Sequence, residues 1–374
     1  MSCPGVNRDE ALMARTFSRL VTSLPTTVPF VAPDALERRS GRAIRLRLGA
    51  NESAFGISPL ARRAMTQATD RISWYADPES YNLRQRLAQV HALAMENLVV
   101  GSGIDDLLGL VVRTFLDPGS PAVTSLGAYP TFNYHVAGYG GALHRVLYRH
   151  DRNDLDALAD TACRVGARLI YLANPDNPTG TWHTGQRILQ FLESVPDDCF
   201  VLLDEAYVEF APQEDVIAVA SIYPRLIRLR TFSKAHGMAG ARIGYGIAAP
   251  ETIAAFDKVR MHFGVNMFAQ TGALASLDDP EFLAGVVDAV AEGRDDYHRL
   301  GRELGLPTLP SAANFVVMDT GSAENARFLL NALLQQGVFI RVPGAPTLDR
   351  FIRVTVGTPT ERTGFAAVMR DLAE

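Results

Sequence analysis

RTFSKAHGMAGARIGYG, residues 230–246, runs from the end of an apolar strand through a glycine-rich turn into a second short strand. It contains Lys234, and the only other lysine in the chain is Lys258, although lysines and arginines together number 36. Because the chain otherwise places its positive charge on arginine, this lysine is a candidate for chemistry that needs an amine. An amine can lose its proton and attack a carbonyl carbon, whereas a guanidinium cannot. Chance placement is the alternative.

The sequence around this stretch follows an α/β pattern. From about residue 60 to 250, short apolar runs alternate with helical periodicity, which is typical of strands joined by crossover helices in a mostly parallel sheet. We predict strands at 97–101, 121–125, 142–148, 168–174, 200–206, 226–231 and 242–248, with helices such as 104–116 and 185–195. Several of these strands are continuously apolar, as expected for a sheet covered by helices on both faces.

The remaining segments predict a smaller α+β domain. A helical pattern over 267–304 is followed by a strand at 314–319, a helix at 323–336 and strands at 338–341 and 351–357. The chain begins with an amphipathic stretch, ALMARTFSRLV, and then passes through a proline-containing loop. We divide it into an N-terminal arm (1–45) that joins the small domain, a large domain (46–255) and a small C-terminal domain (256–374).

Composition excludes several classes of protein. The chain has 374 residues, 47% hydrophobic and 21% charged, as is common for a soluble globular protein. A net charge of −5 without a basic block argues against a nucleic-acid partner. Neither a signal-peptide core nor an apolar run of 18 residues occurs, so we expect no membrane partner. Cys3, Cys163 and Cys199 lie far apart and lack metal-ligand spacing, which favours a cytoplasmic protein without a metal.

Polar residues stand at the carboxyl ends of the predicted strands, where open parallel sheets bind ligands. GSGIDD (101–106) opens a helix whose free N–H groups could hold a phosphate, or it is a plain strand-to-helix turn. ANPDNPTGT (173–181) is a rigid turn that directs its asparagine side chains to defined places. Asp204 ends an apolar strand, where a buried carboxylate needs a cation unless it caps the next helix.

A single ligand accounts for these signals together with the opening stretch. It has a phosphate for a helix N-terminus, Ser233 and Arg242, a carbonyl for Lys234 to attack, and a protonatable ring nitrogen to pair with Asp204. Pyridoxal phosphate carries all three groups. The combination is much more specific than any one of its members.

Four motifs occur in the order and near the spacing of one protein family: NPDNPTG (174–180), DEAYVEF (204–210), RTFSKAHGMAGARIGYG and IRVTVGT (352–358). With them the chain resembles the fold-type-I pyridoxal-phosphate aminotransferases, and among these the histidinol-phosphate aminotransferases. The resemblance covers nearly the whole chain from RLGANES (47–53) onward. It implies an enzyme that moves an amino group between an amino acid or amino-alcohol phosphate and a 2-oxo acid.

The resemblance implies roles for residues around the cofactor ring. Lys234 would form the internal Schiff base and carry the α-proton of the substrate. Asp204 would keep the pyridine nitrogen protonated, and Tyr207 and Asn177 would hydrogen-bond the ring hydroxyl. Phe132, in AYPTF, matches the aromatic residue that stacks on the ring.

The resemblance also implies how the cofactor phosphate is held. The implied groups are Ser233, Arg242 and the backbone of Gly103, Ile104 and Asp105. Tyr75, in WYADPES, matches a tyrosine that reaches the phosphate site of a neighbouring subunit. The resemblance therefore implies a homodimer with shared active sites.

For the substrate, the resemblance implies an anchor at Arg353. Its guanidinium would clamp the acidic group of the substrate together with Asn177, while the backbone of Ala50 and Asn51 closes the other side. The residue-based alternative is that Arg353 is a strand arginine in a surface ion pair.

The sequence departs from the family at a second arginine, which histidinol-phosphate enzymes can use to grip the substrate phosphate. Eleven residues after Arg353 the chain has Gly364, with Arg362 two residues earlier. Histidinol phosphate is then less expected as the substrate. Aromatic side chains could favour an aromatic amino-acid aminotransferase instead: Phe132, Tyr129, Tyr134 and Trp74.

Two other functions remain open. A decarboxylase or lyase can share this scaffold, because one fold hosts several reactions. A cofactor-binding effector domain of a transcription regulator would need a DNA-binding module, and the residues before RLGANES are too few and too rich in loops to form one.

Overall fold

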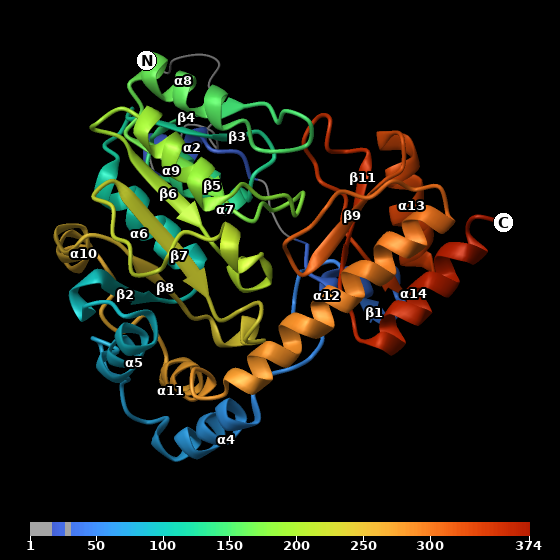
Figure 1. Cartoon of the computed structure of the whole chain (residues 1–374), viewed down its shortest axis with the longest axis horizontal. Helices are drawn as coiled ribbons and strands as arrows, with labels where there is room; N and C mark the ends of the chain where they lie inside the picture. Colours follow the sequence, from blue (N-terminus) through green and yellow to red (C-terminus); the bar gives the residue numbers. More distant parts are fainter. Residues whose placement is uncertain (1–16, 27–30) are drawn as a thin grey trace, which may run out of the picture.

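The computed structural model describes residues 17–26 and 31–374, so most of the predicted amphipathic start lies outside the described residues. Its larger lobe is built on a seven-stranded sheet with the strand order β2-β8-β7-β6-β5-β3-β4 (Figure 1). The strands are β2 (Leu98–Gly101), β3 (Pro121–Ser125), β4 (Ala142–Val146), β5 (Leu169–Ala173), β6 (Phe200–Asp204), β7 (Leu226–Thr231) and β8 (Gly244–Ile247). Only β8 runs antiparallel to its neighbours, so the predicted mostly parallel seven-stranded sheet is confirmed.

Helices cover both faces of this sheet, which explains the continuous apolar strands. In β5, Leu169 and Tyr171 pack in one hydrophobic cluster, while Ile170 and Leu172 pack in another on the opposite face. The first cluster is formed with α6 (Ile104–Phe115), α7 (Pro130–Gly138) and α10 (Pro250–Asp257), and the second with α8 (Leu155–Val165) and α9 (Gly185–Ser194). Because both faces are covered, successive strand residues are all buried.

The smaller lobe is α+β, as predicted. Its strands β9 (Phe315–Asp319) and β11 (Phe351–Thr355) pair antiparallel, and β10 (Val338–Phe339) pairs with β1 (Leu46–Arg47). Its helices are α12 (Pro280–Glu303), α13 (Ala323–Gln335) and α14 (Pro359–Asp371). In Figure 1, α12 is the long orange helix that extends from near α4 and α11 to the smaller lobe.

The long helical pattern over 267–304 forms two helices, α11 (Met267–Ser276) and α12. Pro280 has no N–H to donate and occupies the first turn of α12, where none is needed. The carboxylate of Asp279 caps the same helix by accepting from the N–H of Phe282 at 3.3 Å. A proline next to a capping residue therefore separates the two helices.

The division at residues 45/46 and 255/256 stays a prediction, and two contacts bear on it. Leu48 packs in the cluster of the smaller lobe, following the pairing of β1 with β10. In contrast, α11 packs against α4 (Pro59–Ala68) and α5 (Tyr81–His91) beside the larger sheet. By packing, residues 46–48 thus group with the smaller lobe, and α11 groups with the larger one.

The described part of the N-terminal arm touches both lobes. After α3 (Pro33–Ser40), the guanidinium groups of Arg42 and Arg45 donate to the backbone oxygens of Gln335 and Gln336 in the smaller lobe. Leu20, in α2 (Arg19–Ser23), instead lies against the turn at Gly140 in the larger lobe.

Short 3-10 turns occupy Thr69–Arg71, Met95–Asn97, Val208–Phe210, Gln213–Asp215 and Ala239–Ala241. Within residues 17–26 and 31–374, no helix is long and apolar enough to cross a membrane.

Candidate active site

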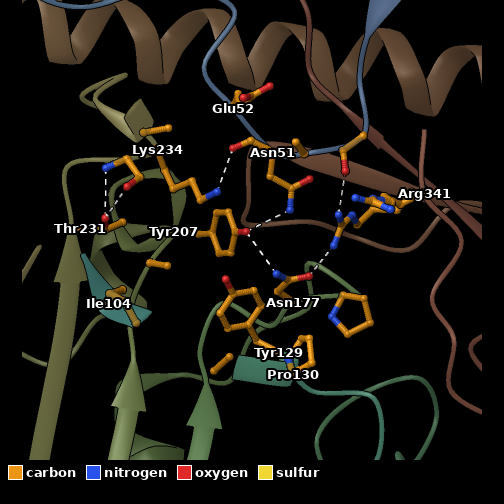
Figure 2. A pocket seen from close by; sticks show the side chains of 18 of the residues that line it. Asn51, Glu52, Ile104, Tyr129, Pro130, Asn177, Tyr207, Thr231, Lys234 and Arg341 are labelled. Carbon is orange, nitrogen blue, oxygen red and sulfur yellow. Dashed lines mark hydrogen bonds between the residues drawn. The ribbon is translucent and has the colours of Figure 1, made fainter. Parts of the chain in front are cut away.

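A cavity of about 530 Å³ lies at the carboxyl ends of β5, β6 and β7, with walls from both lobes. The predicted site residues that line it are Ala50, Asn51, Ile104, Asp105, Asn177, Asp204, Tyr207, Ser233, Lys234, Arg242 and Arg353. Gly103, Phe132 and Tyr75 do not line it. Figure 2 shows Lys234, Tyr207 and Asn177 facing one another across this space. Residues from motifs far apart in the sequence therefore meet at one site.

Lys234 follows β7 and points into the cavity. Its Nζ donates to the backbone oxygen of Asn51 at 3.0 Å (Figure 2). Burial and the nearby positive charge of Arg353 lower the pKa of Lys234 to about 8. Roughly a tenth of such amines are neutral at pH 7, far more than for an ordinary lysine. The position thus suits an amine that attacks a carbonyl.

The backbone after Lys234 requires a glycine. Gly237 has a φ of 72°, and a Cβ there would lie 1.8 Å from the backbone oxygen of Gly56. Any side chain would clash with this segment, which leads to α4. The glycine-rich turn of the opening stretch therefore brings the chain around Lys234 close to residues 56–57.

Asp204 is a buried carboxylate at the end of β6. It accepts from the hydroxyl of Tyr171 at 2.7 Å and from the N–H of Ala206 at 3.0 Å. Burial raises the pKa of Asp204 to about 6. Among the described residues, no lysine, arginine or histidine lies within ion-pair distance of it. A buried acid that lacks a cation but lines a cavity fits a protonated ring nitrogen.

The neighbouring acid, Glu205, has a different role because it points to the other face of the sheet. Its carboxylate accepts from Arg228 at 2.8 and 3.1 Å and from Arg230 at 2.9 Å. Burial alone would raise the pKa of Glu205, but Arg230 and Arg228 hold it below its ordinary value. Glu205 thus ties β6 to β7, while Asp204 faces the cavity.

Arg353 lies on β11 and enters the cavity from the smaller lobe. Its Nη1 donates to Asn177 Oδ1 at 2.5 Å, and its Nη2 donates to the backbone oxygen of Gly49 at 3.0 Å. Burial lowers the pKa of Arg353 to about 10, and its buried Nε has no hydrogen-bond partner among the described residues. No described acid pairs with it, so the surface-ion-pair alternative is wrong. A buried guanidinium without an acid suits an anionic substrate group.

Tyr207 lies between Lys234 and Asn177 in the cavity (Figure 2). Its hydroxyl accepts from Asn51 Nδ2 at 3.0 Å and from Asn177 Nδ2 at 3.4 Å. Burial raises the pKa of Tyr207 to about 12. Because both amides donate, the hydroxyl proton of Tyr207 is available to a ligand oxygen.

A phosphate fits the end of the cavity formed by α6. This helix begins at Ile104 after Gly103, which has a φ of 84° and provides no side-chain cap. Arg242 Nη2 donates to Asp105 Oδ2 at 3.3 Å, and a Cβ on Gly103 would lie only 2.7 Å from that nitrogen. Ser233 Oγ accepts from Thr231 at 2.9 Å, which leaves the hydroxyl proton of Ser233 for another acceptor. Helix N–H groups, a hydroxyl and a guanidinium form an anion site.

Phe132 does not line the cavity, and its stacking on the cofactor ring stays a prediction. Its side chain is fully buried and stacks on Tyr171, with ring centroids 5.0 Å apart. Tyr129 lines the cavity instead, and its hydroxyl donates to Asp105 Oδ1 at 3.0 Å (Figure 2). The reason is local: α7 begins at Pro130, so residue 129 stays at the cavity while residue 132 turns into the core.

The residues around the missing second arginine lie away from the cavity. Arg362 is buried in an ion pair with Asp296 at 2.7 Å, and neither it nor Gly364 lines the cavity. Arg341, twelve residues before Arg353, does line it, and its backbone forms a β-bridge with Arg353. Its Nη2 donates to the backbone oxygen of Val31 at 2.8 Å. An arginine next to Arg353 is therefore supplied by the segment after β10 rather than by α14.

Tyr75 does not line the cavity of its own chain. It is 84% exposed, and its ring contacts Phe263 with centroids 4.8 Å apart.

Two charged residues that line the cavity, Arg47 and Glu52, were not predicted from the sequence. Their charged groups lie 3.7 Å apart. Their position within RLGANES (47–53) was the available signal.

Residues 43–368 match the profile of the family described as aminotransferase class I and II. The chain belongs to the class I and II aminotransferases. It is 34% identical over 360 residues to histidinol-phosphate aminotransferase 2 of Carboxydothermus hydrogenoformans, covering 95% of this chain and 99% of that protein. It is 35% identical over 357 residues to the histidinol-phosphate aminotransferase of Moorella thermoacetica, covering 94% and 92%.

Among solved structures, this aminotransferase is similar to the histidinol-phosphate aminotransferase of Sinorhizobium meliloti in complex with pyridoxal-5'-phosphate. The TM-score is 0.92 with 45% identity, and the match covers 96% of this chain and 98% of the other. The chain is thus a fold-type-I pyridoxal-phosphate-dependent aminotransferase, most like the histidinol-phosphate enzymes. The effector-domain hypothesis is therefore wrong.

Proposed function

We propose that this enzyme transfers the amino group of an amino-alcohol phosphate of the histidinol-phosphate class to a 2-oxo acid, with its cofactor linked through Lys234. Pyridoxal phosphate, when bound, supplies a ring that withdraws electrons from the α-carbon of the substrate. Its phosphate would lie at the N-terminus of α6 with Ser233 and Arg242, and its ring nitrogen would face Asp204. A buried carboxylate with no cation partner among the described residues, and the uncapped N-terminus of α6 beside Ser233 and Arg242, support this placement.

The residues of the cavity can perform proton transfer from the substrate. Lys234, as a neutral amine close to the α-carbon, would accept the α-proton and return it to the neighbouring carbon. Its lowered pKa, about 8, keeps a fraction of it neutral at physiological pH. Arg353 and Asn177 would hold the anionic group of the substrate so that the C–H bond stands perpendicular to the ring. The same residues would serve both half-reactions.

The observation that carries the substrate class is the presence of two arginines, Arg341 and Arg353, on one wall of the cavity. A phosphate dianion can accept hydrogen bonds from both guanidinium groups. An acceptor with two carboxylates, such as 2-oxoglutarate, can use the same pair. One pocket would therefore accept both substrates in turn.

Replacing Arg341 with glutamine tests this assignment. We expect KM for histidinol phosphate to rise roughly 100-fold, because a charge-assisted hydrogen bond to phosphate is lost, while kcat changes less than tenfold. KM for the unphosphorylated amino alcohol should change little. Steady-state kinetics with both amines measure this, and Arg302→Gln, an exposed arginine on α12, is the control.

Two outcomes would contradict the proposed substrate. A phenylalanine kcat/KM that exceeds that of histidinol phosphate and resists Arg341→Gln would favour an aromatic amino-acid aminotransferase. Release of CO2 without consumption of the 2-oxo acid would favour a decarboxylase.

We also propose a homodimer in which Tyr75 reaches the phosphate site of the second copy. The support is a group of large apolar side chains that are more than half exposed in the single chain: Ile72, Trp74, Tyr75, Met261 and Phe263. Exposure of so many large apolar groups within two short segments is characteristic of a contact surface.

The cytoplasmic location of the enzyme stays a prediction.

Replacing Tyr75 with phenylalanine separates the two parts of the dimer proposal. The dimer should persist, because the ring is kept, while the dissociation constant of pyridoxal phosphate rises roughly tenfold through loss of one phosphate contact. Sedimentation velocity and equilibrium dialysis measure these quantities, with Tyr139→Phe, another exposed tyrosine, as the control. A fully active wild-type monomer would refute the proposal.

A further inference from the structure

Asn51 makes hydrogen bonds to both Lys234 and Tyr207, two contacts that the sequence motifs did not predict. Its backbone oxygen accepts from Lys234 at 3.0 Å, and its side-chain Nδ2 donates to the hydroxyl of Tyr207 at 3.0 Å (Figure 2). Its φ of 55° lies in the left-handed region, which asparagine adopts more readily than most residues other than glycine. The hydrogen bonds that fix Asn51 in this conformation therefore influence both Lys234 and Tyr207.

Thr355 makes two hydrogen bonds to Asn51 with one hydroxyl. Its Oγ1 accepts from the backbone N–H of Asn51 at 3.0 Å and donates to Asn51 Oδ1 at 3.1 Å. Since Oδ1 is engaged in this way, the amide nitrogen of the same group points to Tyr207. Thr355 is 2% exposed and lies two residues after Arg353 on β11, on the same face of the strand. One strand thus positions the substrate anchor and the orientation of Asn51.

Asn314 holds the other side of the same peptide. Its Nδ2 donates to the backbone oxygen of Asn51 at 3.1 Å, the oxygen that also accepts from Lys234. Asn314 is 2% exposed, and its Oδ1 has no hydrogen-bond partner among the described residues. Leaving a buried amide oxygen unpaired is costly, and the donated hydrogen bond to Asn51 offsets part of that cost.

We propose that Thr355 and Asn314 are positioning residues of the active site, which together hold Asn51 so that its peptide oxygen receives Lys234 and its amide donates to Tyr207. Neither residue lines the cavity, so neither touches substrate or cofactor directly. Their effect passes through Asn51 to the charge state of Lys234 and the direction of the Tyr207 hydroxyl. This inference rests on the proposed role of Lys234.

The test uses Thr355→Val, which keeps the shape of the side chain and removes the hydroxyl. Without that hydroxyl, the amide of Asn51 can rotate and its peptide can move away from Lys234. A hydrogen bond from an ammonium to a carbonyl favours the charged form, so its loss lowers the pKa of Lys234. We expect a shift of half a pH unit or more, together with a roughly tenfold weaker affinity for pyridoxal phosphate.

The chain provides its own reference for the pKa measurement. Lys234 and Lys258 are its only lysines, and Lys258 is exposed. Cofactor-free protein is acetylated briefly with acetic anhydride at a series of pH values, and the modified peptides are quantified by mass spectrometry. The midpoint for Lys234 should move down in Thr355→Val, while that for Lys258 stays fixed. This readout does not depend on turnover.

Two further variants separate positioning from simple loss of stability. Thr355→Ser keeps the hydroxyl and should restore both the lysine midpoint and cofactor affinity. Thr320→Val removes another buried hydroxyl of the smaller lobe, one that donates to the backbone oxygens of Arg350 and Ser322 rather than to Asn51, and should shift neither quantity. Asn314→Ala should also lower the pH midpoint for acetylation of Lys234, as Thr355→Val does.

The outcomes are distinct. If Thr355→Val folds and leaves the Lys234 midpoint and cofactor affinity at wild-type values, the positioning role is refuted. If it fails to fold, Asn314→Ala alone decides in the same assay. If wild-type protein binds no pyridoxal phosphate, the proposed role of Lys234 fails first, and the lysine midpoints still report whether Thr355 acts on Lys234.

Discussion

Replacement of Lys234 by alanine is expected to lower kcat by about 10⁴-fold or more while the protein keeps its fold and still binds pyridoxal phosphate. The change deletes the nucleophile that links the cofactor and the amine that moves the α-proton. The anion site at α6, Ser233 and Arg242 remains intact, so binding persists without the covalent link. Stopped-flow and steady-state assays with histidinol phosphate and 2-oxoglutarate measure the loss.

The matched control is Lys258→Ala, because Lys258 is the only other lysine and is exposed after α10. It should leave kcat within about twofold, as expected for a surface substitution. Near-normal turnover in Lys234→Ala would remove this residue from the reaction. A failure to bind cofactor at all would instead show that the phosphate contacts were assigned wrongly.

Replacement of Asp204 by asparagine is expected to lower kcat/KM roughly 10³-fold, because a neutral amide cannot stabilise a positively charged ring nitrogen in a buried site. The side chain keeps its size, so the hydrogen bond from Tyr171 can persist. Steady-state kinetics and the absorbance spectrum of the bound cofactor measure the effect. Asp198→Asn, an exposed acid just before β6, is the control and should behave as wild type.

Asp204 also predicts a pH dependence of cofactor binding. Burial raises its pKa to about 6, so in the cofactor-free protein the carboxylate is charged above that pH and protonated below it. A cationic ring nitrogen binds better to the charged form. Affinity for pyridoxal phosphate should therefore fall as the pH drops through 6, and this fall should vanish in Asp204→Asn. A pH-independent affinity in the wild type would contradict the pairing.

The central sheet was predictable because its strands are covered on both faces. Continuous apolar runs such as FVLLD (200–204) leave few alternatives to a buried strand, and they end in the polar residues that line the cavity. Asp204 ends a strand of this kind, and Lys234 and Asn177 each follow one. Parallel strands bring their carboxyl ends to one edge, so spacing along the chain was enough to group these residues.

Other parts of the site depend on details that spacing does not contain. Whether Tyr129 or Phe132 faces the cavity depends on where α7 begins, and helix starts are set by single residues such as Pro130. Arg341 was missed because its position is determined by a β-bridge to Arg353, a contact between the segment after β10 and strand β11. The position eleven residues after Arg353 lies in α14, where the nearby Arg362 pairs with Asp296 instead of reaching the cavity.

Thr355 and Asn314 could not be found from residue type. Threonine and asparagine are common in loops and strands, and neither side chain carries a charge that would indicate an active site. Their contacts with Asn51 exist only because RLGANES crosses from the smaller lobe to the cavity and brings residue 51 next to β11. Tertiary structure alone brings these residues together.

The attachment of pyridoxal phosphate to one particular amine is most directly tested by borohydride reduction of the cofactor-loaded protein, followed by proteolysis and mass spectrometry. With two lysines in the chain, the result has few possible readings. We expect the reduced adduct on the peptide containing Lys234 and none on the peptide containing Lys258. An adduct confined to Lys258, or none on either peptide of a protein that retains bound cofactor, would contradict this expectation.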